Sequence, residues 1–148
     1  MTSPLVSPET ILGARILVVD DEAANLALMR QVLAREGYRD VVTEADPARA
    51  LERFGDVVPD LVILDLMMPG LDGYALLDAL QRLVPADDLV PILVLTADAS
   101  LDARRRALAL GAREIVIKPI DVLEFGLRVA NLLQLRFLVA ALRARGAA

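Results

Sequence analysis

Residues 60–73 read DLVILDLMMPGLDG, and the first half of this stretch decides the fold class. The residues from Leu61 to Leu64 are all apolar, so a strand here would present apolar side chains on both of its faces. Such a run is typical of a strand in a parallel sheet that helices cover on both sides. The second half, rich in Pro, Gly and Asp, predicts a turn soon after Asp65.

Similar runs rich in β-branched residues flank this stretch. They lie at residues 15–19, 40–43, 92–95 and 114–117. Segments with the helical period separate them, at residues 23–36, 47–54, 74–83 and 101–110, and a last one follows Asp121. The alternation predicts an α/β fold: a doubly wound five-stranded parallel sheet with five helices, the last one extended. Residues 1–14, which contain Pro4, Pro8 and Gly13, are predicted to be a loose N-terminal leader.

The composition excludes several classes of function. The chain has 148 residues, 56% of them hydrophobic and 25% charged, which predicts one ordered domain. It contains no cysteine and no histidine, so disulfides, zinc-thiolate sites and a phosphohistidine within this chain are excluded. No apolar run in the sequence approaches the roughly 20 residues that span a bilayer, and the start lacks a secretory pattern. We therefore expect a cytoplasmic protein with no membrane partner.

The charge balance argues against a nucleic-acid partner. The net charge is −5 and aromatic residues make up 3% of the chain, so phosphate neutralisation and base stacking are both poorly supported. The run Arg104-Arg105-Arg106 lies in a predicted helix, where three consecutive side chains point in different directions. We interpret it as a solvated helix surface.

Polar residues follow four of the predicted strands at the point where each ends. They are Asp20-Asp21-Glu22, Asp65, Thr96 and Lys118-Pro119, and Lys118 is the only lysine of the chain. Each alone is explained by a helix cap, a turn or the end of a strand. Together they lie at the carboxyl edge of the sheet, where such folds bind ligands. Carboxylates this close repel one another unless a cation lies between them, and their oxygen atoms are ligands that suit Mg²⁺. The ammonium of Lys118 and the hydroxyl of Thr96 would then stabilise the charge of a phosphoryl group bound opposite the metal.

Four segments closely resemble the motifs of the receiver domain of two-component response regulators. They are residues 16–22 (ILVVDDE), 60–73, 95–97 (LTA) and 118–119 (KP). The resemblance runs from about Arg15 to the early 130s and implies a receiver domain over residues 15–133. It also implies a flavodoxin-like sheet with the strand order 2-1-3-4-5.

The resemblance assigns a phosphoacceptor and its metal site. Asp65 is similar to the carboxylate that takes a phosphoryl group from a sensor histidine kinase. Asp21 resembles the direct Mg²⁺ ligand, Asp20 its neighbour acting mainly through water, and Asp65 and the backbone carbonyl of Met67 complete the protein ligands. The resemblance gives a phytochrome-type kinase and a histidine phosphotransferase as candidate partners.

The resemblance also assigns the residues around the phosphoryl group. Thr96 and Lys118 would contact its oxygens, and Ala97 would leave it accessible. The family usually has Tyr or Phe three residues before the lysine, as a switch coupled to the threonine. This chain has Ile115 there, so the switch would be aliphatic.

The C-terminal segment predicts a long helix and an interface. Asp121 and Glu124 form a capping-box pattern that opens a helix at Val122, and no breaker follows before Gly146. The extension, residues 134–148, is too apolar for a solvated helix, so we expect it to form a homodimer. The candidate contacts are Leu132, Leu135, Leu138, Val139 and Leu142. The alternative is a helix that folds back on its own domain.

A phosphoacceptor with no other enzyme activity is thus the leading hypothesis for function. The alternatives are a phosphorylation-independent dimeric scaffold and the receiver part of a longer regulator. A Mg²⁺-dependent phosphatase with an aspartyl-phosphate intermediate would usually need a second Asp where the chain has Met67. A flavin-binding protein of similar topology would need a phosphate loop in place of the acidic residues after the first strand.

Overall fold

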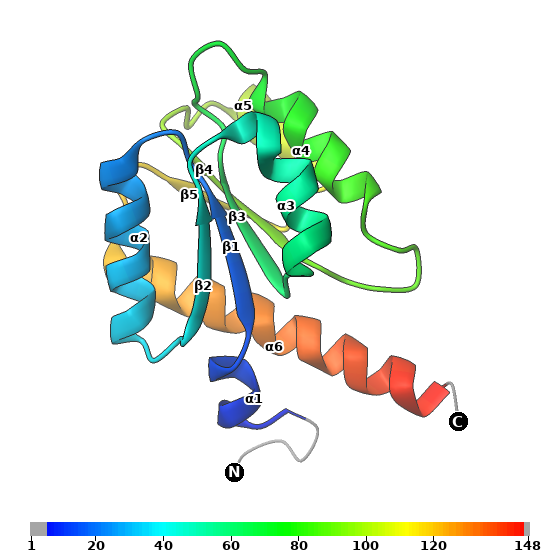
Figure 1. The fold of residues 1–148 in the computed structure, drawn as a ribbon. Helices are drawn as coiled ribbons and strands as arrows, with labels where there is room; N and C mark the ends of the chain where they lie inside the picture. The colour runs from blue at the N-terminus through cyan, green and yellow to red at the C-terminus, as the bar shows by residue number, and fades with distance from the viewer. Residues whose placement is uncertain (1–5, 147–148) are drawn as a thin grey trace.

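Five parallel strands form one sheet in the order β2-β1-β3-β4-β5 (Figure 1). The structure is a computed structural model and describes residues 6–146. The strands are β1 (Arg15–Val19), β2 (Asp40–Glu44), β3 (Leu61–Asp65), β4 (Ile92–Thr96) and β5 (Glu114–Ile117). The predicted fold class and strand order are both confirmed.

Helices cover both faces of the sheet. They are α1 (Pro8–Leu12), α2 (Ala23–Arg35), α3 (Ala50–Val57), α4 (Gly73–Arg82), α5 (Leu101–Ala109) and α6 (Val122–Gly146), with a 3₁₀ turn, η1 (Pro47–Arg49), before α3. The cores formed with the sheet show that α2 and α6 pack on one face and α4 and α5 on the other. The three layers are visible in Figure 1.

Alternation along the strands explains why both faces are covered. In β3, Leu61 and Ile63 belong to the core beneath α2 and α6, whereas Val62 and Leu64 belong to the core beneath α4. All four side chains are fully buried. A strand with two buried faces is what the apolar run predicts.

The prediction of a loose leader over residues 1–14 is wrong for residues 8–12. Residues 8–12 form helix α1, whose N-cap is Ser7: its hydroxyl accepts a hydrogen bond from the Thr10 amide. Ile11 and Leu12 pack against the core beneath α2 and α6. Burial of this apolar pair is the physical reason for the sixth helix, and Ser7 followed by Pro8 is the signal for its start. Residues 1–5 of the predicted leader lie outside the described residues.

The long C-terminal helix is confirmed. Helix α6 runs over 25 residues and begins after Asp121, whose carboxylate accepts a hydrogen bond from the Glu124 amide at 3.0 Å. By length and composition alone α6 would be able to cross a membrane. Its first half, however, contributes Phe125, Val129 and Leu133 to the core of the domain. Residues 147–148 of the predicted extension lie outside the described residues.

Candidate functional site

The structure brings together the predicted residues at the carboxyl edge of the sheet. Asp65 and Thr96 are the last residues of β3 and β4, Asp20 follows β1, and Lys118 follows β5. Carboxylate oxygens of Asp20, Asp21 and Asp65 lie within 4.8 Å of one another. The Lys118 Nζ atom donates a hydrogen bond to Asp65 Oδ2 at 2.9 Å. Thus four separate strand ends supply one polar site, as the topology predicts.

Backbone amides two residues further along the chain hold three of these side chains in place. Asp20 Oδ1 accepts from the Glu22 amide at 2.9 Å, and Asp65 Oδ1 accepts from the Met67 amide at 3.0 Å. Thr96 Oγ1 accepts from the Asp98 amide at 3.1 Å. Asp20, Asp65 and Thr96 are 1–2% exposed, so their side chains are fixed within the protein rather than solvated.

The acidic cluster is electrostatically suited to a cation. Burial raises the pKa of Asp20; the hydrogen bond from the Glu22 amide partly offsets this, and the negative charge of Asp65 raises the pKa further. Among the described residues, Asp20 Oδ2 is buried and has no hydrogen-bond partner. A buried carboxylate oxygen without a donor, close to two other carboxylates, fits a hard divalent cation such as Mg²⁺. Asp20, Asp21 and Asp65 are the residues that would hold it.

The Asp20→Asn variant should be more stable than the wild type in the absence of divalent cations. Asparagine keeps the acceptor for the Glu22 amide but removes a buried charge beside Asp65, for an expected gain of about 1 kcal/mol in the free energy of unfolding. Urea unfolding in EDTA measures this gain.

The gain should depend on pH and on Mg²⁺. Folding raises the pKa of Asp20, so the ionised carboxylate lowers the free energy of unfolding of the wild type at pH values above that pKa. This loss of stability disappears as the pH falls through the raised pKa and the carboxylate becomes protonated. The difference between the two proteins should therefore shrink in acid. Added Mg²⁺ should stabilise the wild type more than the variant. A variant that unfolds more easily than the wild type at pH 7 in EDTA would contradict the account.

The remaining predicted site residues differ in their surroundings. The amide of Met67 is part of the site, but its side chain is exposed. Ile115 is buried in β5 on the sheet face covered by α4.

Two further acidic residues lie on the loops that follow β4 and β3. The amide of Ser100 and, to a smaller extent, its hydroxyl donate hydrogen bonds to Asp98, two residues after Thr96, and lower the pKa of Asp98. Helix α4 begins beside the site because the carboxylate of Asp72 caps the Tyr74 and Ala75 amides.

Sequence reasoning missed the residues that α2 contributes. A cavity of about 300 Å³ adjoins the site, and its lining includes Asn25 and Leu28 from α2 together with Asp20, Lys118 and Pro119. Asn25 and Leu28 lie within a helix-period segment, where nothing in the sequence marks them as neighbours of a strand end. Their position depends on how α2 packs, which the sequence pattern does not give.

The candidate contacts on α6 fall into two groups. Leu132 is 7% exposed and belongs to the core beneath α2 and α6. The prediction that Leu132 contacts a second chain is therefore wrong. Leu135 and Leu142 are 38% and 53% exposed, and Leu138 and Val139 are partly buried. Leu132 differs because it lies on the side of the helix that packs against the sheet.

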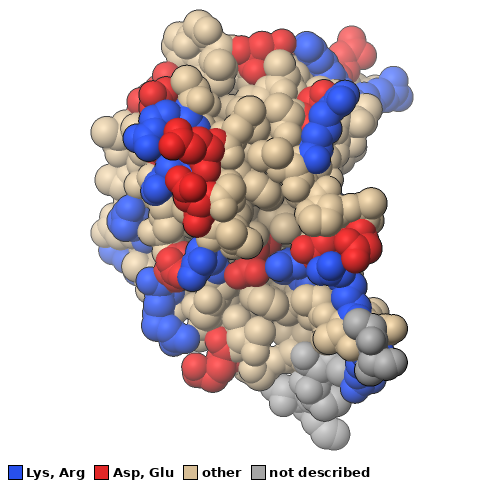
Figure 2. Space-filling model, turned by 45° about the vertical axis from the view of Figure 1, so that its right-hand side comes forward, with Lys and Arg blue, Asp and Glu red and all other residues tan. Residues whose placement is uncertain are grey.

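The three arginines of the run on α5 have different surroundings. Arg106 stacks over the ring of Tyr74, with its guanidinium carbon 4.1 Å from the ring centroid, and thereby joins α5 to α4. Arg104 and Arg105 are exposed. On the face shown in Figure 2, basic and acidic side chains lie interspersed rather than in separate patches. The exposure of Arg104 and Arg105 agrees with the predicted solvated helix surface.

Comparison with known sequences identifies relatives over most of the chain. Residues 16–130 match the family model of the response regulator receiver domain. The chain is 36% identical over 136 residues to the response regulator PleD of Caulobacter vibrioides (strain NA1000 / CB15N), covering 92% of this chain and 30% of PleD. It is 37% identical over 126 residues to the transcriptional regulatory protein PrrA of Mycobacterium tuberculosis, covering 85% and 52% respectively. The chain thus spans about half or less of the length of these curated relatives.

Solved structures agree with this result. A putative response regulator from Chloroflexus aurantiacus J-10-fl superposes with a TM-score of 0.73 and 33% identity, covering 82% of this chain and 98% of that one. A CheY-like receiver domain protein from Methanospirillum hungatei JF-1 gives a TM-score of 0.75 and 27% identity, covering 84% and 96%. Since the match spans the sheet and every strand end that supplies the site, the chain belongs to the response regulator receiver domain family.

Proposed function

We propose that Asp65 accepts a phosphoryl group from the phosphohistidine of a sensor histidine kinase, in a Mg²⁺-dependent step of two-component signalling. One observation carries the proposal: Lys118 Nζ lies 2.9 Å from Asp65 Oδ2, within the cluster formed by three carboxylates. Receiver domains act in signalling between a phosphodonor and a response, and this site has the groups that such an acceptor needs.

The reaction is a displacement at phosphorus. A carboxylate oxygen of Asp65 forms a bond to phosphorus, while the bond between phosphorus and the donor imidazole nitrogen breaks and leaves its electron pair on nitrogen. The Lys118 ammonium and the Thr96 hydroxyl stabilise the charge on the phosphoryl oxygens. The chain has no histidine, so the donor is another molecule.

The metal ligands complete the site. The proposed protein ligands are Asp20, Asp21, Asp65 and the backbone carbonyl of Met67. Bound Mg²⁺ would offset the negative charge of the carboxylates and of the phosphoryl group. The buried, unpartnered oxygen of Asp20 supports this assignment. The switch would pair Thr96 with the buried aliphatic side chain of Ile115.

The mass of the intact protein tests the proposal. Incubation with acetyl phosphate and Mg²⁺ should add one phosphoryl group, and replacement of Mg²⁺ by EDTA should prevent the addition. Complexation with beryllofluoride, a phosphoryl mimic, covers the case in which hydrolysis outpaces detection. If neither an adduct nor a beryllofluoride complex forms, the chain is better described as a phosphorylation-independent scaffold.

We also propose that two copies of the chain pair through α6. Leu135, Leu138 and Leu142 repeat at spacings of three and four, the spacing that packs one helix along another. Leu135 and Leu142 are exposed, and Leu138 between them is partly buried. Exposed leucines in such a row are more stable when a second apolar surface covers them. Val139 lies beside this row and is partly buried.

A double substitution in this leucine row should separate the copies. In the Leu135→Glu/Leu142→Glu variant, four carboxylates would enter the interface of a dimer, and we expect light scattering after size exclusion to give the monomer mass. Leu123→Glu is the matched control, because Leu123 lies on the same helix and is exposed but is outside the row. A wild-type protein that is monomeric at high concentration, or a double variant that remains dimeric, would contradict the proposal.

A further inference from the structure

The second half of α6 is held to its own domain in a different way from the first half. Up to Leu133 the helix contributes buried apolar side chains to the core. From residue 134 to Gly146 the structure places no fully buried side chain on the helix, although Phe137 packs partly against the core. We call residues 134–146 the distal half of α6. Another interaction is needed to explain why it lies along the domain.

Arg136 supplies that interaction. Its Nε atom lies 3.2 Å from Asp60 Oδ1, and its Nη1 atom lies 2.6 Å from Asp88 Oδ1 and 3.2 Å from the carbonyl oxygen of Leu89. The three charged side chains are only 14–20% exposed, so solvent screens them less than a surface pair. The second oxygen of Asp60 accepts from the Arg15 amide at 2.9 Å, which ties the arrangement to β1.

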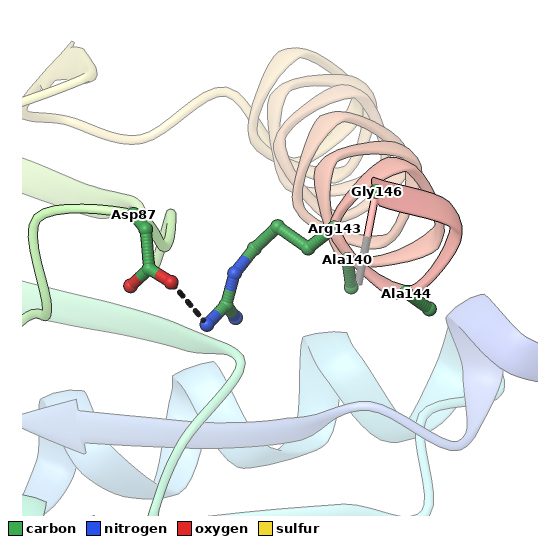
Figure 3. A pocket seen from close by; sticks show the side chains of 5 residues that line it. All are labelled: Asp87, Ala140, Arg143, Ala144 and Gly146. Atoms are coloured by element: carbon green, nitrogen blue, oxygen red, sulfur yellow. Dashed lines mark hydrogen bonds and ion pairs between the residues drawn. The ribbon is translucent and has the colours of Figure 1, made fainter. Parts of the chain in front are cut away.

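Arg143 repeats the contact two helical turns later. Its Nη2 atom lies 3.1 Å from Asp87 Oδ2, and its Nη1 atom lies 3.1 Å from Asp88 Oδ1. Figure 3 shows the Arg143 side chain reaching from α6 to Asp87 on the loop that precedes β4. Arg143 and Asp87 are 40% and 76% exposed, so this pair is weaker than the one that Arg136 makes.

We infer that Arg136, supported by Arg143, clamps the distal half of α6 to Asp60, Asp87 and Asp88 at the amino edge of the sheet, and thereby directs the exposed Leu135 and Leu142 of the leucine row away from the domain. Arg136 and Arg143 each follow a leucine of the row by one residue. One residue turns a helix by about 100°, so the clamped side and the leucine row are different sides of α6. The contacts of the clamp all lie within one chain. Only the role of the leucine row in joining two copies of the chain rests on the proposed dimer.

The identity of the central residue matters for the clamp. A guanidinium is a planar fork that can bond two carboxylates and a carbonyl at once, whereas a lysine ammonium is a compact point charge. Removing Arg136 would also take the cation from the partly buried Asp60 and leave Asp88 with Arg143 alone. The clamp lies at the amino end of β3, and the proposed phosphoacceptor Asp65 lies at the carboxyl end. Phosphoryl uptake therefore reports whether a clamp variant has kept its fold.

Hydrogen exchange in the full chain tests the clamp. In Arg136→Met we expect the amides of residues 137–146 to exchange about tenfold faster or more, while those of β3 change little. Arg136→Lys should give an intermediate increase and Arg143→Met a smaller one. Arg128→Met is the matched control, since Arg128 lies on the first half of α6 and pairs with Glu114 of β5 and with Glu124 of α6.

Two results would overturn the inference. One is unchanged exchange in residues 137–146 of Arg136→Met, which would mean that apolar packing alone holds the distal half. The other is an equal increase throughout β3, which would make Arg136 a general stabiliser rather than a clamp. The measurement is made on monomeric protein, at a dilution checked by light scattering, so a failure of the proposed dimer does not affect it. Uptake from acetyl phosphate is followed separately.

Discussion

The Asp65→Asn variant is expected to take up no phosphoryl group. Asparagine has the shape of aspartate, but its amide is a poor nucleophile and carries no charge. Loss of an enzyme nucleophile typically costs about a thousandfold or more in rate, so uptake from acetyl phosphate should fall below detection by intact mass. The side-chain oxygen of the asparagine would retain the hydrogen bond from the Met67 amide, so the fold should persist.

A matched control separates this effect from a general loss of charge. Asp78 is a carboxylate on α4 that pairs with Arg82 at the surface. Asp78→Asn removes the same charge and should leave uptake at the wild-type level. Uptake that persists in Asp65→Asn but requires Mg²⁺ would place the acceptor on another side chain.

The second large effect is expected from Gly73→Ala. Gly73 begins α4, and a Cβ atom added there would lie 2.8 Å from Leu66 Cα and would also collide with the Leu66 carbonyl oxygen. Both contacts are with backbone, which cannot rotate away as a side chain can. We expect a loss of about 2–3 kcal/mol in the free energy of unfolding, measured by urea denaturation.

The same substitution should also slow phosphoryl uptake. Leu66 directly follows Asp65, and the next amide, that of Met67, holds the Asp65 carboxylate. A shift of this loop would therefore move the acceptor relative to Lys118. Gly55→Ala is the control: Gly55 lies within α3, and a Cβ atom there meets nothing within 4 Å. Since alanine favours helix, that variant should gain up to about 1 kcal/mol. If Gly73→Ala is as stable as the wild type, the close approach to Leu66 is not essential.

The fold and the composition of the site could be predicted because both depend on local patterns. The apolar run from Leu61 to Leu64 requires two covered faces, and parallel strands place their carboxyl ends at one edge. Asp65, Thr96 and Lys118 each end or follow such a strand, so their proximity follows from topology alone. Distances and hydrogen bonds within the site still required the structure.

Other features could not be predicted because their partners are distant in sequence. Arg136 lies 76 residues from Asp60 and 48 from Asp88, and no spacing rule connects them. Leu132 and Leu135 lie in the same apolar stretch of the sequence, and nothing in its pattern distinguishes them. The packing of α6 on the sheet decides that Leu132 is buried and Leu135 is exposed. The pattern does not predict the short helix α1, because Pro4, Pro8 and Gly13 in residues 1–14 are typical of a loop and obscure the apolar pair Ile11 and Leu12. That pair is stable only against the core that it covers.

The location of the phosphoryl group tests the central claim most directly. After incubation with acetyl phosphate and Mg²⁺, borohydride reduces an aspartyl phosphate to homoserine, which peptide sequencing by mass spectrometry can place on the chain. We expect homoserine at position 65 and unmodified aspartate at Asp20 and Asp21. Homoserine at either of those two positions, or modification that is equally abundant in EDTA, would contradict the assignment of Asp65 as the phosphoacceptor of a Mg²⁺-dependent site.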